Sequence, residues 1–188
     1  MPYSEKLNLV FIPIPKSGGE LVDIAMQGYT DVTKTWRDYD LYSINIKSPK
    51  SFSIVRNPWD RVFACYNDCH LDENSDYDLL KNYTFKDCVK MLYNNRELLD
   101  LPVLHRPAFK HGWGHQHSYI FDGRKLQVDQ IMRFEFMDEV DEYLKDVYGI
   151  DVSHTDTTTN YKDHYDDEMI RIVSEIYKDD IALLGYVY

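Results

Sequence analysis

The pattern of apolar and polar positions predicts a strand, a loop and a helix near the start of the chain. Residues 8–12 form a short apolar run that is typical of a buried parallel strand. Residues 15–19 combine a proline with two glycines, and these residue types favour a loop. Leu21, Ile24 and Ala25 then recur at helical spacing, so a helix is expected directly after the loop.

A second block repeats this order further along the chain. Residues 51–55 are strand-like, and Asn57 followed by Pro58 is typical of a helix N-cap and of the first helical position. Apolar residues then recur at helical spacing, which indicates a helix with one apolar face. These residues are Trp59, Val62, Phe63 and Tyr66.

The middle of the chain is predicted to hold a helix, a loop and another strand. Residues 85–97 indicate a helix within a polar, tyrosine-rich stretch. Residues 101–117 contain several prolines and glycines and read as a loop. Residues 126–132 resemble a further strand.

Two apolar stripes near the C-terminus predict two more helices. The first stripe is ended by Gly149 and consists of Phe136, Val140, Tyr143, Leu144 and Val147. The second consists of Met169, Ile170, Val173, Ile176 and Tyr177, and Gly185 suits the end of a short helix after it. Because strands alternate with helices, we expect one α/β domain over residues 1–188.

The composition argues against nucleic acid and membranes as partners and favours the cytoplasm as the compartment. A formal net charge of −11 argues against a nucleic-acid partner, because a phosphate backbone demands a broad basic surface. No apolar run approaches the ~18 residues of a membrane span, and the first residues carry no export signal. We therefore expect a cytoplasmic protein without a membrane partner.

The three cysteines are expected to be core residues. Cys65, Cys69 and Cys88 are an odd number in a chain without a secretion signal, which favours reduced thiols over a disulfide framework. Cys65 and Cys69 could share a helix face, but two thiols without nearby partner ligands make a poor zinc site.

Two basic residues follow the first two predicted strands and indicate an anion site. A strand, a glycine-containing loop and a helix direct backbone N–H groups and the helix dipole at one spot, and Lys16 adds a full charge there. Arg56 follows the second strand, where ligands collect in open α/β sheets. An ordinary solvent turn at Lys16 and an arginine that only caps its own sheet are the alternatives. Together the two positions favour a ligand with phosphates at both ends.

Four stretches resemble the carbohydrate-type sulfotransferases. Residues 11–19 resemble the 5′-phosphosulfate loop of that family, and residues 52–66 resemble its 3′-phosphate segment. Residues 116–135 resemble its Gln...Asp...Arg-x-Glu region, and residues 161–186 resemble its closing Tyr-x-x-Tyr, helix, Asp-x-x-x-x-Gly-Tyr pattern. The resemblance covers nearly the whole chain in the family's order.

The resemblance implies a fold and a reaction. The implied fold is a three-layer P-loop-like α/β fold with a mainly parallel central sheet flanked by helices. The implied reaction transfers a sulfuryl group from 3′-phosphoadenosine-5′-phosphosulfate (PAPS) to a hydroxyl or amine of a small-molecule or glycan acceptor. The product is adenosine 3′,5′-bisphosphate (PAP), and no metal is required.

The resemblance also implies the residues that hold PAPS. Lys16 would act in catalysis, and the loop residues at the phosphosulfate would be Pro15, Lys16, Ser17, Gly18 and Gly19. Arg56 would hold the 3′-phosphate, and Ala64 stands where the family has a serine. Arg61 matches an arginine that faces the acceptor, with a salt bridge to an acidic neighbour as the alternative. Arg133 either contacts PAPS or pairs with Glu135.

The general base and the turnover itself are left open by the sequence. The candidates for the base are Glu20, His111, His115 and His117. Glu20 also replaces a hydroxyl residue of the family, so a nucleotide-binding protein without turnover is one alternative. A P-loop-type small-molecule kinase is another, although the chain lacks the Gly-x-x-x-x-Gly-Lys-Ser/Thr loop.

Overall fold

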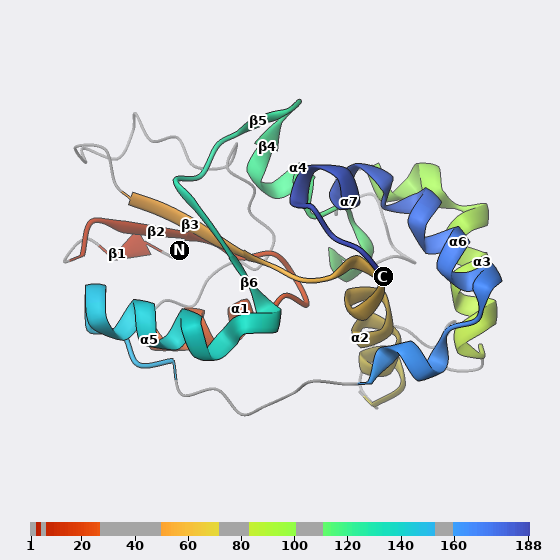
Figure 1. Cartoon of the computed structure of the whole chain (residues 1–188), viewed down its shortest axis with the longest axis horizontal. Helices are drawn as coiled ribbons and strands as arrows, with labels where there is room; N and C mark the ends of the chain where they lie inside the picture. The colour runs from red at the N-terminus through yellow and green to blue at the C-terminus, as the bar shows by residue number, and fades with distance from the viewer. Residues whose placement is uncertain (1–2, 5–6, 27–49, 72–82, 101–110, 153–159) are drawn as a thin grey trace. The chain divides into compact units, whose positions relative to one another are not determined.

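A computed structural model describes residues 3–4, 7–26, 50–71, 83–100, 111–152 and 160–188 (Figure 1). The chain groups into two compact units, the first made of residues 1–56 and 116–157 and the second of residues 57–115 and 158–188. The expectation of a single domain stays a prediction. The first part of the predicted loop, residues 101–110, lies outside the described residues.

The first unit is an α/β unit built on a sheet with three parallel strands. The strand order is β1-β2-β3-β6, with β1 antiparallel to β2 and the other neighbours parallel. The strands are β1 (Tyr3–Ser4), β2 (Leu9–Ile12), β3 (Lys50–Val55) and β6 (Gln130–Arg133). A separate antiparallel pair is formed by β4 (Phe121–Asp122) and β5 (Lys125–Leu126).

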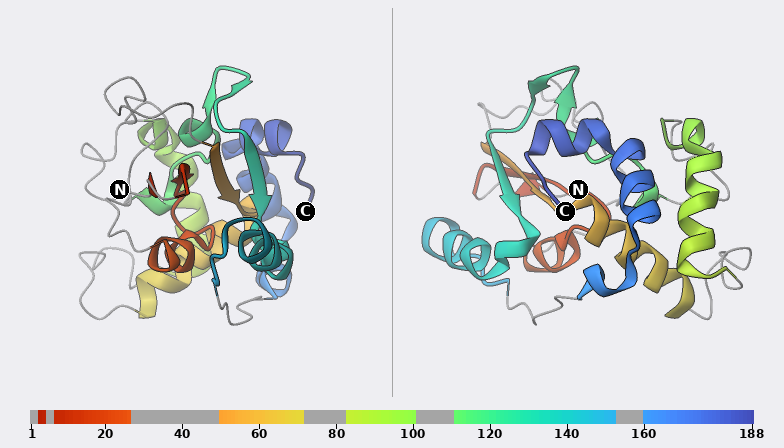
Figure 2. Two further views of the ribbon diagram at one scale, coloured as in Figure 1. Left: turned by 90° about the vertical axis from the view of Figure 1, so that its left-hand side faces the viewer. Right: turned by 45° about the vertical axis from the view of Figure 1, so that its right-hand side comes forward.

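Alternate strand residues form the core of the first unit with two helices. The helices α1 (Gly19–Ala25) and α5 (Met137–Tyr148) lie on the same side of the sheet (Figures 1 and 2). The core residues from the strands are Leu9, Phe11, Phe52, Ile54 and Met132, and they cluster with Val22 of α1 and with Met137, Val140 and Leu144 of α5. Each strand thus presents every second side chain to these helices, as the two-residue period of a strand requires.

Most of the predicted elements of the first unit are confirmed, but some of the predicted apolar faces are wrong. The strands β2 and β3 and the helix α1 occur where expected, and Gly149 ends α5 in the left-handed conformation. Leu21 and Ala25 of the predicted stripe pack against the core together with Val22, but Ile24 is 69% exposed. Phe136 and Val147 are likewise exposed, at 52% and 55%. Their spacing fits a helix but does not by itself show which neighbours reach the core.

The strand predicted over residues 126–132 is interrupted in the structure. Leu126 ends β5 and Gln130 begins β6, and residues 127–129 belong to neither strand. Asp129, directly before β6, pairs with Ser51 of β3 through its backbone and its side chain. Its N–H donates to the Ser51 carbonyl over 3.0 Å, and its carboxylate accepts from the Ser51 N–H and hydroxyl. The interruption lies at Gln127, whose backbone N–H donates to the carbonyl of Ile120 and not to β3.

The described part of the second unit is helical. Its elements are α2 (Pro58–Leu71), α3 (Phe85–Asn94), η2 (Arg96–Asp100), η4 (His111–Trp113), η6 (Tyr161–His164), α6 (Asp167–Ile176) and α7 (Lys178–Leu184). The helix predicted over residues 85–97 ends earlier, and a 3-10 helix follows it. The short helix before Gly185 is confirmed. None of the helices in the described ranges is both long and apolar enough to cross a bilayer.

The cysteines lie on α2 and α3, and an ion-pair network joins α3 to the start of α6. Cys65, Cys69 and Cys88 are all buried and free, as predicted, and burial raises the pKa of the Cys88 thiol. Lys86 of α3 lies 2.7 Å from the carboxylate of Asp166 and 2.9 Å from that of Glu168. These ion pairs are exposed, so each contributes little to stability.

The predicted N-cap of α2 generates a test of local stability. The side-chain oxygen of Asn57 accepts a hydrogen bond of 3.0 Å from the backbone N–H of Trp59. We expect Asn57→Ala to lower the free energy of unfolding by about 1 kcal/mol and the melting temperature by about 2–4 °C, measured by thermal unfolding. Asn57→Ser keeps an accepting oxygen at the cap and should lose less. Both variants lose the bond from the Asn57 Nδ2 to the Val187 carbonyl, so their difference reports the cap. An equal loss for both variants would contradict the role of the cap.

Candidate functional site

The loops after β2 and β3 end at one edge of the parallel sheet. Ile12, the last residue of β2, pairs in register with Ser53 of β3. The loop that carries Lys16 and the position of Arg56, directly after β3, therefore lie at the same carboxyl edge. Ligands of open parallel sheets bind at this edge.

The Lys16 loop is a tight turn with two left-handed residues. The backbone N–H of Ser17 donates to the carbonyl of Ile14 over 3.2 Å, which closes the turn. Lys16 has φ of 65°, which is uncommon for a residue other than glycine, and Gly18 has φ of 79°. Strained backbone of this kind costs on the order of 1–3 kcal/mol and clusters at ligand-binding sites.

Close packing explains why the loop contains two glycines. A Cβ added to Gly18 would lie 2.6 Å from the ring of Phe134, and one added to Gly19 would lie 2.9 Å from the ring of Phe11. Both distances are shorter than any real contact of a Cβ atom. The loop thus lies directly against the ring of Phe134, and α1 begins directly against the core.

Arg56 reaches from the end of β3 to the Lys16 loop. Its Nη1 donates to the backbone carbonyl of Lys16 over 3.3 Å, and its guanidinium carbon lies 4.0 Å from the centre of the Phe134 ring. Arg56 is only 6% exposed, so its charge lies in a partly desolvated setting. Such a cation interacts more strongly with an anion than one in bulk water does.

Gln116 joins both loops and was not predicted as a site residue. Its Oε1 accepts hydrogen bonds from the backbone N–H of Arg56 at 2.9 Å and from the hydroxyl of Ser17 at 3.3 Å. Its Nε2 donates to the carbonyl of Arg56 at 2.8 Å. Gln116 stands in one of the stretches that resemble the family, but no local pattern distinguishes a glutamine that pairs with distant backbone from one at the surface.

The structure brings most of the predicted PAPS-binding residues into the first unit. Pro15, Ser17 and Gly19 are buried in the loop, and Arg133 ends β6 opposite Val55 in register. The predicted ion pair between Arg133 and Glu135 stays a prediction. Glu20 is exposed in the first turn of α1, immediately after the loop. A carboxylate there is open to solvent and to a ligand at the same edge.

Arg61 and Ala64 lie on α2 in the second unit. Arg61 is 2% exposed, and its Nη1 donates to the carbonyl of Gly114 over 2.8 Å. The side chain of Arg61 thus holds the backbone of Gly114 in place through this hydrogen bond. Ala64 is half-buried, so its burial does not assign it to the protein core or to a phosphate site.

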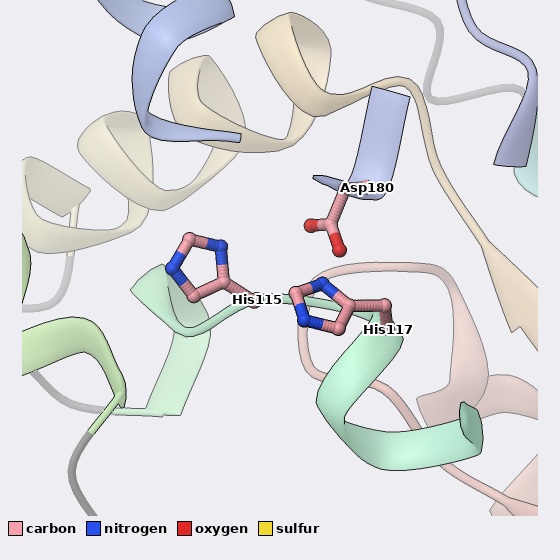
Figure 3. Close-up of side chains that lie close together, drawn as sticks. All are labelled: His115, His117 and Asp180. Atoms are coloured by element: carbon pink, nitrogen blue, oxygen red, sulfur yellow. The ribbon is translucent and has the colours of Figure 1, made fainter. Parts of the chain in front are cut away.

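The predicted histidines are divided between the two units. His115 is buried in the second unit, where its ring meets that of Tyr177 at 5.4 Å, and its ligand nitrogen lies within 4.8 Å of a carboxylate oxygen of Asp180 (Figure 3). Asp180 was missed by sequence reasoning, because it is far from His115 along the chain. Imidazole and carboxylate are also metal ligands, and this pair supplies two of the three or four that a zinc site uses. His117 begins α4 (His117–Ile120) in the first unit, and the side chain of His111 is outside the described residues.

Asp23 is a titratable group of α1 that sequence reasoning also missed. Burial, together with the nearby carboxylate of Glu20, raises the pKa of Asp23 to about 6. Its Oδ1 is buried and has no hydrogen-bond partner among the described residues. A carboxyl group that titrates near neutral pH suits proton transfer better than an ordinary surface aspartate does.

The raised pKa of Asp23 makes stability depend on pH. A folded-state pKa above the ordinary value of 3.8 means that the protonated form favours the folded chain. This contribution is complete below about pH 4 and is lost as the pH rises through 6. We expect Asp23→Asn to raise the melting temperature by about 2 °C at pH 7.5 and by less at pH 4.5. Asp146→Asn, at an exposed position of α5, is the control and should show no such dependence. A difference for Asp23→Asn that does not change with pH would contradict the assignment.

Comparison with known proteins adds no relative. The chain matches no family model, no curated protein and no solved structure. The residues that the two loops bring together at the edge of the sheet therefore carry the functional proposal.

Proposed function

We propose that the chain is a PAPS-dependent sulfotransferase that acts on a hydroxyl or amine of a small molecule or glycan. The observation that carries this proposal is the hydrogen bond from the Arg56 guanidinium to the Lys16 carbonyl at the edge of the parallel sheet. It joins two cationic loops, as a ligand with two separate phosphates requires. The sequence resemblance of both loops to the sulfotransferases supports the same ligand.

The proposal includes a P-loop-like fold for the first unit. Support comes from the order of β2, the Lys16 loop and α1, and from the left-handed backbone of Lys16 and Gly18. Successive backbone N–H groups in such a turn form a concave site for an anion. The dipole of the following helix adds a partial positive charge at the same place.

In the proposed reaction Lys16 stabilises the leaving group. The acceptor oxygen or nitrogen attacks the sulfur with a lone pair, and the bond between sulfur and the bridging phosphate oxygen breaks. The bonding electrons pass to the 5′-phosphate of PAP, where the Lys16 ammonium and the backbone N–H groups of the loop balance the new charge. The proton of the acceptor passes to a general base of the protein. Arg56 holds the 3′-phosphate and so orients the donor.

A nucleotide-binding protein without turnover is the second candidate function. The observation that favours it is the exposed carboxylate of Glu20, which lies one residue after the loop and repels an anion there. In the sulfotransferase proposal the same carboxylate is a candidate for the general base. The two functions therefore differ in whether a labelled sulfuryl group leaves PAPS, and not in whether PAP binds.

The division of roles between Lys16 and Arg56 is testable. We expect Lys16→Ala to reduce transfer of labelled sulfate from PAPS by about 10²–10³-fold, because its charge is needed most in the transition state. Arg56→Ala should instead weaken PAP binding by about 10–100-fold, as loss of charged hydrogen bonds predicts. Transfer is measured with a panel of acceptors, and binding is measured by calorimetric titration.

Lys125→Ala, at an exposed lysine of β5, is the matched control and should change neither quantity. PAP should also raise the melting temperature of the unchanged chain, while ATP with magnesium does little. Equal shifts with both nucleotides would refute PAPS specificity. Loss of binding alone in both variants would refute the proposed division of roles.

The general base is tested by removing proton acceptors while keeping their shape. We expect Glu20→Gln to lower turnover by about 10²-fold or more with PAP binding intact, because Glu20 is exposed next to the loop. Asp23→Asn and His115→Asn are compared in the same assay. Full activity of Glu20→Gln would exclude Glu20, and the variant that loses turnover together with the basic limb of the pH–rate profile would identify the base instead.

A further inference from the structure

We infer that Gln116 is a positioning residue that makes the two phosphate sites of the first unit bind one ligand as a unit. This inference rests on the proposed function. It concerns how the Lys16 loop and Arg56 are held relative to each other, and not which group reacts. Gln116 itself would touch neither phosphate.

The amide of Gln116 pairs with Arg56 at two points. It accepts from the backbone N–H of Arg56 and donates to the backbone carbonyl of the same residue, at 2.9 and 2.8 Å. A neighbouring strand would pair with a residue in the same way. Because Gln116 is fully buried, water does not compete for these bonds, and the backbone of Arg56 is fixed just where β3 has ended.

The same amide oxygen reaches the Lys16 loop through Ser17. The Ser17 hydroxyl is fully buried and donates to Gln116, so this side chain holds the loop while its backbone remains part of the turn. Ser17 and Gln116 are 99 positions apart in the chain. The bond therefore connects two segments that local structure alone would not keep together.

Two further contacts connect the same loops, and both depend on where the Arg56 backbone lies. The guanidinium donates to the Lys16 carbonyl, and the ring of Phe134 lies against both the guanidinium and Gly18. Moving the end of β3 would disturb both contacts. The amide of Gln116 thus holds the backbone of Arg56 and the side chain of Ser17 at once.

Fixed loops bind a ligand with two phosphates more tightly than mobile loops do. When the first phosphate has bound, the second site is already ordered, so no free energy is spent on ordering it. The two phosphates of one ligand therefore bind with positive coupling. Without Gln116 each site could still bind its own phosphate. Loss of Gln116 should therefore weaken binding of the bisphosphate more than binding of either monophosphate. A residue that only stabilises the fold would affect all three ligands alike.

The test compares three adenosine ligands on three variants by calorimetric titration. The ligands are PAP, adenosine 5′-monophosphate and adenosine 3′-monophosphate. The variants are Gln116→Met, which keeps the length of the side chain, Ser17→Ala, which removes only the bond to the loop, and Gln127→Met as the control. The Gln127 amide donates to the carbonyl of Lys125, two residues away, and Gln127 lies outside the two loops.

We expect Gln116→Met to weaken PAP binding by about tenfold or more, within the usual range of coupling between sites, and each monophosphate by less than about threefold. Ser17→Ala should weaken PAP binding by about threefold and leave the binding of both monophosphates unchanged, and Gln127→Met should change nothing. Circular dichroism at the titration temperature establishes that each variant is folded. Should Gln116→Met not fold, Ser17→Ala decides, because it leaves both bonds to Arg56 intact.

Equal weakening of all three ligands would overturn the inference and leave Gln116 a purely structural residue. Unchanged PAP affinity in Ser17→Ala and Gln116→Met would overturn it as well. The proposed function is tested separately by the unaltered chain. If that chain bound PAP no better than the monophosphates, the proposed ligand itself would be wrong, whatever the variants did.

Discussion

The need to pair buried polar groups where two parallel strands end is the constraint on which the candidate site depends. Arg56 is buried directly after the end of β3, where an unpaired backbone N–H or carbonyl group would cost on the order of 1–3 kcal/mol. The amide of Gln116 satisfies both groups and uses its remaining capacity on Ser17. One side chain thereby connects β3 to the loop after β2.

This arrangement holds a strained loop and a buried cation in place. Lys16 adopts a left-handed conformation, and Arg56 lies between the Lys16 carbonyl and the ring of Phe134. The left-handed backbone of Lys16 and the desolvation of the Arg56 charge each cost free energy. Both persist because the hydrophobic contacts of the sheet with α1 and α5 stabilise the surrounding unit. Sites that bind charged ligands commonly combine such strain with a rigid support.

The second unit uses the same principle around the backbone of residues 112–114. Their carbonyls accept hydrogen bonds from the thiol of Cys65, the hydroxyl of Tyr177 and the guanidinium of Arg61. Burial raises the pKa of the Tyr177 hydroxyl, which therefore stays a neutral donor. Three buried side chains from α2 and from the end of α6 thus satisfy the carbonyls at the end of η4 and directly after it.

The sequence by itself determined the features that depend on near neighbours. The strands β2 and β3, the cap at Asn57 and the left-handed glycines at 149 and 185 follow from local patterns, because propensity and capping act within a few residues. The order of strand, loop and helix along the sequence also placed Lys16 and Arg56 after their strands. Tertiary structure alone decided that Ile24 is exposed, that Asp180 lies near His115, and that Gln116 joins the loops. Those outcomes depend on contacts between residues that are dozens of positions apart, and a linear pattern carries no record of which distant backbone group a polar side chain will pair with.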